Sequence, residues 1–125
     1  MEPATLPLEP FTEGTTWEGI PSLAIQVNGT PPATQLASAE MRFERTDAAE
    51  GTAAEAERVI LSSADATQIQ IQDPDLWEIT VPEQDVPGLT EGNWRWVIET
   101  TDQAAAKRVY VVGTITALPN VNTTA

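Results

Sequence analysis

The chain has 125 residues, which corresponds to one domain with room for a single hydrophobic core. It contains neither cysteine nor histidine, which excludes disulfides, thiolate metal sites, thiol nucleophiles and the commonest general base. Nineteen acidic and six basic residues give a net charge of −13, and a field of that sign repels nucleic-acid phosphates and anionic lipid. We therefore expect neither nucleic acid nor a membrane as a partner.

Residues 1–12 are expected to form an arm or an edge strand. Leu6 and Leu8 flank Pro7, which has no N–H for a central strand. The segment lacks the basic start and the long apolar stretch of a secretory signal. Elsewhere the apolar runs are far shorter than the roughly 20 residues of a membrane span. We expect synthesis in the reducing cytosol of a host cell.

Residues 13–118 predict an all-β domain, an Ig-like β-sandwich of about seven antiparallel strands. Apolar and polar residues alternate with period two in short runs that turn residues separate. A closed barrel of the same strands is the structural alternative. The predicted strands are Ser22–Val27, Glu40–Arg45, Arg58–Leu61, Thr67–Gln72, Leu76–Val81, Asn93–Thr100 and Lys107–Leu118.

The segments that connect and follow the predicted strands also have compositions that predict their structure. Thr46–Glu57 is rich in alanine and glutamate without a large apolar residue, which indicates an exposed loop. Pro82–Gly92 predicts an irregular crossing between the sheets. Gly113 lies within the last strand, where glycine indicates a bulge or a close approach of another backbone segment. Residues 119–125 form a polar tail.

Few residues point to catalysis or to metal binding. No glycine cluster predicts a phosphate loop, and Lys107 is the only lysine. Carboxylates are plentiful but fall mainly at outward strand positions or in loops, so we expect no enzyme and no cofactor. Asp65, Asp73 and Asp75 offer oxygen ligands of the kind calcium takes, but Asp73-Pro74-Asp75 is also typical of a capped turn. The turn is the favoured interpretation, so no metal is expected.

The four tryptophans divide into two groups. Trp77 and Trp94 share the parity of core residues. For Trp17 and Trp96 two interpretations stay open, packing in the core and anchoring of a partner protein. The candidate partner-binding residues are Leu6, Leu8, Phe11, Trp17 and Trp96. We expect the arm to be loose in a monomer, where it either frays or adds a strand to a neighbour.

Three stretches follow one another in a familiar order. Residues 11–20 hold a glycine, a small polar pair and a tryptophan before the first core strand. Residues 23–29 and 36–43 give a strand, an N-G-x-P turn and an L-x-x-A start of the next strand. Residues 89–96 and 108–116 give an L-x-x-G-x-W-x-W run and a glycine-containing last strand. This order resembles the Ig-like amino-terminal domains of phage baseplate upper proteins and related small tail and fibre proteins.

The resemblance implies a virion component that acts through protein–protein contacts in several symmetric copies. Members of this family often continue into a fibre-forming region, whereas the short segment 119–125 suits a freestanding adaptor, plug or decoration subunit. The leading hypothesis is a non-enzymatic tail, baseplate or fibre-attachment adaptor located in the virion, with other virion proteins as partners. The alternatives are a capsid decoration protein and a carbohydrate-binding sandwich that uses exposed tryptophans.

Overall fold

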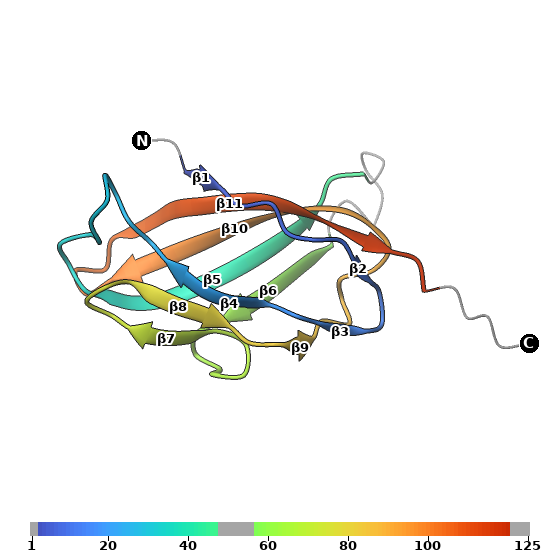
Figure 1. Ribbon diagram of the computed structural model, residues 1–125, viewed down its shortest axis with the longest axis horizontal. Helices are drawn as coiled ribbons and strands as arrows, with labels where there is room; N and C mark the ends of the chain where they lie inside the picture. Colours follow the sequence, from blue (N-terminus) through green and yellow to red (C-terminus); the bar gives the residue numbers. More distant parts are fainter. Residues whose placement is uncertain (1–2, 48–56, 121–125) are drawn as a thin grey trace, which may run out of the picture.

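The computed structural model describes residues 3–47 and 57–120, and within these ranges the chain forms β-strands and turns without a helix. The described part of the chain therefore offers no helix long and apolar enough to cross a membrane. The strands lie in two layers, as Figure 1 shows. The predicted all-β sandwich is confirmed. Most of the loop predicted over Thr46–Glu57 falls outside the described residues.

The larger layer is a six-stranded sheet in the order β1-β11-β10-β5-β6, with β2 also paired to β11. The long strands run antiparallel, whereas β1 and β2 lie parallel to β11. The sheet ends at β1 and β6, so these strands do not close into a barrel. Its strands are β1 (Ala4–Thr5), β2 (Phe11–Thr12), β5 (Leu36–Arg45), β6 (Arg58–Ser62), β10 (Gly92–Asp102) and β11 (Lys107–Leu118).

The second layer contains two short ladders. One is the antiparallel sheet β4-β8-β7, and the other is the pair β3–β9. Trp17 lies opposite Gln84 and Ile20 lies opposite Val81, so the second ladder continues the first along the same layer. The strands are β3 (Thr16–Trp17), β4 (Ile20–Ala24), β7 (Gln70–Asp73), β8 (Glu78–Val81) and β9 (Gln84–Asp85).

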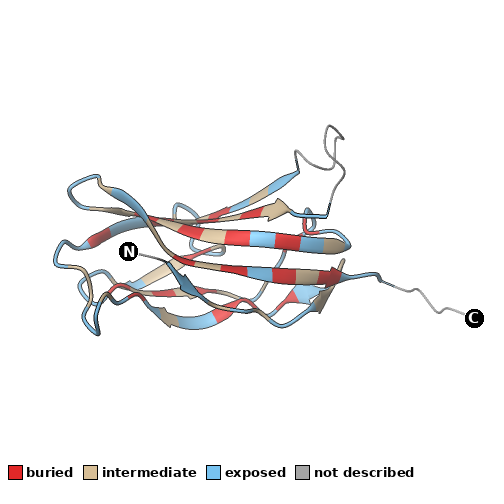
Figure 2. Ribbon diagram, turned by 90° about the horizontal axis from the view of Figure 1, so that it is seen from above, coloured by how far each residue is buried: buried red, intermediate tan, exposed pale blue. Residues whose placement is uncertain are grey.

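The core fills the space between the two layers. Buried and exposed residues alternate along the long strands, as Figure 2 shows. The inward parity predicted for Met41 and Phe43 on β5, and for Trp94 and Ile98 on β10, is confirmed. Burial of such large side chains supplies the driving force for the fold, at about 25 cal/mol for each Å² of apolar surface removed from water.

Most strand boundaries differ from the predicted ones by one to four residues, and two of these differences have a visible cause. β5 begins at Leu36 rather than at Glu40, since Leu36 pairs with Asp102 of β10. β4 covers Ile20–Ala24 rather than Ser22–Val27. Its chain turns at Asn28, which has a φ of 54°, the left-handed conformation that asparagine tolerates.

Candidate functional site

The arm that carries three of the candidate partner-binding residues lies along β11 of its own chain. The Leu6 N–H donates to Val112 O at 2.8 Å, and the Leu8 N–H donates to Thr114 O at 3.4 Å. Leu6, Leu8 and Phe11 are partly buried against the core. Of the two alternatives predicted for residues 1–12, the structure therefore has the edge strand of the large sheet and not an arm that is loose in the monomer.

A glycine makes this close approach of the arm possible. A Cβ atom at residue 113 would lie 2.5 Å from a ring carbon of Trp96 and still closer to the carbonyl oxygen of Leu6. The predicted close backbone approach at Gly113 is therefore confirmed. The bulge in this ladder lies elsewhere, where β10 shifts register between Ile98 and Glu99.

The structure places the other two candidates, Trp17 and Trp96, in the core. Trp17 is 2% exposed and packs edge-to-face on Phe43 with ring centroids 5.9 Å apart. Trp96 is 0% exposed, and its ring N–H donates to Thr114 O at 3.3 Å. Neither side chain reaches the surface of this chain, so of the two interpretations left open for them the structure supports core packing and not a surface anchor. The structure does not unite the five candidates in one surface site.

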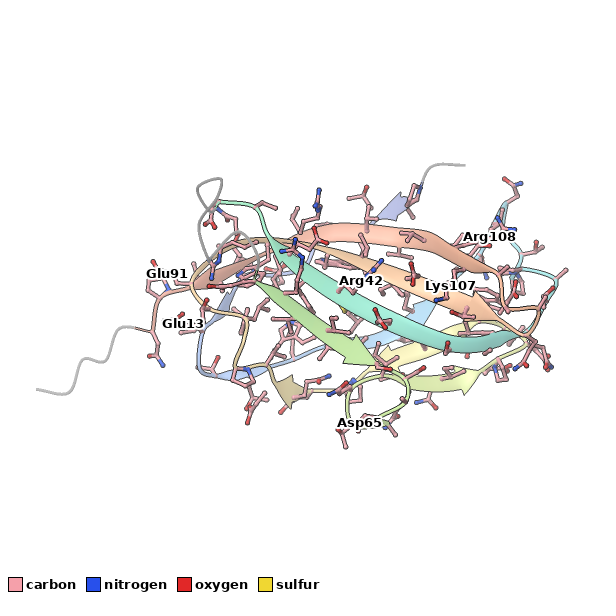
Figure 3. All side chains as sticks on the ribbon, turned by 180° about the vertical axis from the view of Figure 1, so that it is seen from behind. Glu13, Arg42, Asp65, Glu91, Lys107 and Arg108 are labelled. Carbon is pink, nitrogen blue, oxygen red and sulfur yellow. The ribbon has the colours of Figure 1, made fainter. Side chains whose placement is uncertain are left out.

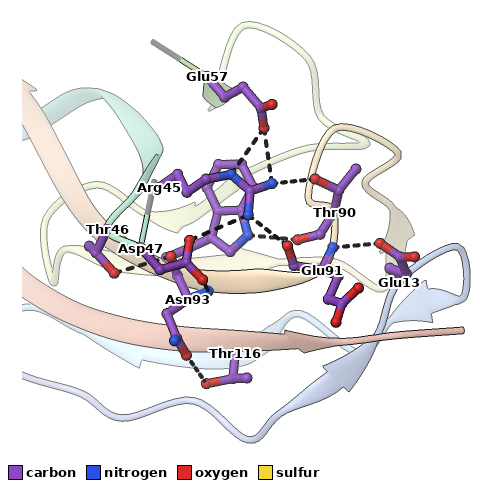
Figure 4. Close-up of polar contacts among 10 residues, drawn as sticks. Glu13, Arg45, Thr46, Asp47, Glu57, Thr90, Glu91, Asn93 and Thr116 are labelled. Atoms are coloured by element: carbon purple, nitrogen blue, oxygen red, sulfur yellow. Dashed lines mark hydrogen bonds and ion pairs between the residues drawn. The ribbon is translucent and has the colours of Figure 1, made fainter. Parts of the chain in front are cut away.

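Arg45 closes one end of the sandwich and was missed as a candidate. Its guanidinium carbon lies 4.4 Å from the centroid of the Trp94 ring, and its side chain is 10% exposed. It donates to Glu91 O at 2.6 Å, to Thr90 Oγ1 and to Glu57 Oε2 at 3.0 Å (Figure 4). The available signal was parity, because Arg45 follows Met41 and Phe43 at the inward positions of β5.

Two carboxylates extend this Arg45 cluster. Asp47 Oδ1 lies 3.5 Å from Arg45 Nη1, and Asp47 Oδ2 accepts the Asn93 N–H at 2.9 Å. The hydrogen bond from Asn93, followed by the contact with Arg45, lowers the pKa of Asp47 below its usual value. Glu13, at the end of the arm, accepts the Glu91 N–H (Figure 4). The cluster thus connects β5, the loop before β10 and the arm.

Every basic residue of the chain belongs to the large sheet. Arg95 lies 2.6 Å from Glu44, and that hydrogen bond lowers the pKa of the Glu44 carboxyl. Arg42 lies 3.2 Å from Glu99. Figure 3 shows Arg42, Lys107 and Arg108 on this side of the molecule. The charges of the large sheet are therefore largely compensated across its outer face.

The charged residues of the second layer and its loops are all acidic. Residues 16–35 hold one acidic residue and residues 63–91 hold seven, and neither segment contains lysine or arginine. Glu18 and Glu83, both exposed, lie in the facing connections between the two short ladders. Two different surfaces result, one compensated and one strongly negative.

The aspartates considered as metal ligands serve local turns. Asp73 Oδ1 accepts the N–H of Asp75 at 3.0 Å and that of Leu76 at 3.1 Å, which confirms the capped turn. Asp65 Oδ1 accepts the Thr67 hydroxyl at 2.7 Å, and this bond lowers the pKa of Asp65. The described residues contain no group of three or more acidic side chains suited to a metal ion.

A scan against protein-family models and searches of curated proteins and of solved structures found no match for this chain. The resemblance to phage baseplate domains stays a prediction, and the proposals that follow rest on the residues of the chain itself.

Proposed function

We propose that this protein is a non-enzymatic structural component of a phage virion, an adaptor in the tail, baseplate or fibre-attachment region. The separation of charge between its two layers carries the proposal. An adaptor must hold different neighbours on different surfaces, and this chain presents a compensated sheet on one side and a negative layer on the other. The resemblance of its sequence motifs to baseplate domains supports the same role.

The negative layer suits a basic surface on a neighbouring virion protein. Opposite charges steer two proteins together and set their relative orientation more than they raise affinity. The glycan-binding alternative depended on exposed tryptophans, and all four tryptophans are buried. No feature of the described surface favours that alternative.

The first test is quantitative mass spectrometry of purified virions separated into heads and tails. Enrichment with tails is the expected result, and the copy number would give the symmetry of the attachment site. Enrichment with heads would identify a capsid decoration protein instead. Absence from both fractions would overturn the virion role.

A second test examines the negative layer. The double variant Glu18→Gln/Glu83→Gln removes two charges from that layer, and Glu40→Gln/Glu99→Gln removes two from the large sheet. We expect a several-fold drop in incorporation for the first variant and little change for the second. Equal incorporation of the two variants would show that the negative layer does not bind the neighbour.

A further inference from the structure

We propose that the arm, residues 4–13, is exchanged between copies of this chain, so that the arm of one copy pairs with β11 of a second copy. The arm contacts seen within the chain would then form between chains. This inference goes beyond the virion role and does not depend on it, because it concerns the purified protein alone.

The arm is held by few hydrogen bonds. Its regular pairing with β11 consists of the two-residue strands β1 and β2. Between and after these strands it donates the N–H of Leu6, Leu8 and Glu13, and the Leu8 bond is long at 3.4 Å. Pro7 and Pro10 have no N–H to donate. Release of the arm therefore breaks far fewer contacts than release of β10 or β5 would.

Three hollows border the arm or the turn that follows it. One of about 380 Å³ is lined by Glu9–Thr12 and by Thr15–Glu18, and one of about 250 Å³ is lined by Gly14, Thr15 and residues 85–87. A third, of about 230 Å³, separates residues 4–6 from β4 and the adjoining residues. These hollows are open to solvent, so they leave part of the arm uncovered by the rest of the chain, and a segment with few buried contacts opens locally at low cost. The turn around Gly14, which has a φ of 75°, is thus placed to act as a hinge.

The edge of β11 is shaped for this particular arm. The partner that supplies an exchanged arm is therefore a second copy of this chain. Gly113 leaves room for the carbonyl of Leu6, and Leu6, Leu8 and Phe11 cover the core edge beside it. Residues 4–8 of the exchanged segment carry no charge, and its acidic residues are Glu9 and Glu13. Exchange of an identical element is a low-cost route to oligomers because it reuses existing contacts. Only the contacts of the turn itself, such as Thr15 with Thr12 O, are lost.

The absence of cysteine from the sequence allows a direct test by cross-linking. Thr5 is the register partner of Val112, and neighbouring strands lie about 4.8 Å apart, within the reach of a disulfide. Single variants Thr5→Cys and Val112→Cys are unfolded together, refolded at increasing concentration and oxidised. We expect a Thr5–Val112 heterodimer that increases with concentration and exceeds, several-fold, the product formed with Gln72→Cys on β7. Tryptophan fluorescence verifies that each variant is folded.

The chain carrying both Thr5→Cys and Val112→Cys supplies the opposite measurement. A cross-link within single chains at every concentration, with no heterodimer above the Gln72→Cys control in the mixture, would overturn the exchange. A second variant inserts three glycines after Gly14. A longer hinge favours the closed monomer, so the heterodimer fraction should fall. An unchanged fraction would also count against exchange through this hinge.

Discussion

At the scale of single residues, Arg45 shows how one charged side chain closes an apolar end of the sandwich. It is nearly buried, stacks on Trp94 and donates hydrogen bonds to Glu91 O and Thr90. Replacement by methionine keeps the aliphatic length but leaves the Glu91 carbonyl without this donor. We expect Arg45→Met to lower the free energy of unfolding by about 1–3 kcal/mol, since the hydrogen bonds of a charged donor and its contact with the Trp94 ring are lost together.

Urea denaturation followed by tryptophan fluorescence measures this loss. Arg95→Met is the matched control, because Arg95 is exposed and its pair with Glu44 is of the surface kind, worth about 0–1 kcal/mol. Equal losses for the two variants would show that the Arg45 cluster is not a stabilising centre.

Asp47 makes the same cluster sensitive to pH. The Asn93 N–H and Arg45 lower its pKa in the folded chain, so its contribution to stability is complete above the unfolded pKa of about 3.9. That contribution is lost as the pH falls through the lower folded pKa. We expect the destabilisation caused by Asp47→Asn to be present at pH 6 and to shrink below about pH 4.

Thermal unfolding from pH 3 to pH 7 measures this dependence, with Glu9→Gln as a variant that removes one charge from an exposed arm position. The difference between the two variants isolates the contacts of Asp47 from the change in net charge. A difference that stays constant over this range would contradict the assignment.

At the scale of elements, the pairing of the arm with β11 depends on the missing side chain at residue 113. Gly113→Ala would push a methyl group against Trp96 and the Leu6 carbonyl. Overpacking of this kind costs about 1–3 kcal/mol, and here it also separates the arm from β11. We expect faster hydrogen exchange at the Leu6 and Leu8 amides, together with reduced stability.

Gly29→Ala is the control for that experiment. Gly29 has a φ of 83° and open space around it, so this substitution brings backbone strain but no contact with the arm. Unchanged exchange at the Leu6 amide in Gly113→Ala would show that the arm tolerates a side chain beneath it.

The sequence predicted elements where period-two alternation was strong. β10 and β5 were located correctly because Trp94, Trp96 and Met41 alternate with charged residues. The parallel pairing of the arm was not predictable, since it depends on β11, some 100 residues away, and on space at a single glycine. Trp17 lies in an irregular stretch without parity, so only the tertiary contact with Phe43 reveals its burial.

At the scale of the whole molecule, the uneven distribution of charge predicts how stability responds to salt. Residues 16–35 and 63–91, which form the second layer and its loops, hold eight acidic residues, one plus seven, and neither segment contains a basic residue. Repulsion among them acts over a Debye length that shrinks from about 30 Å at 0.01 M salt to about 8 Å at 0.15 M. We expect the melting temperature to rise as sodium chloride is added, because screened repulsion outweighs the weakening of surface ion pairs on the large sheet.

The two double variants designed for the negative layer separate these opposing effects. Glu18→Gln/Glu83→Gln relieves repulsion, so it should raise the melting temperature at low salt and flatten its dependence on salt. Glu40→Gln/Glu99→Gln removes the same charge but deprives Arg42 of both carboxylate partners, so it should not stabilise the chain. If both variants shift the melting temperature equally, net charge alone governs stability. If only Glu18→Gln/Glu83→Gln raises the melting temperature, repulsion among the acidic residues of the second layer destabilises the free chain. A basic neighbour would relieve that repulsion on binding.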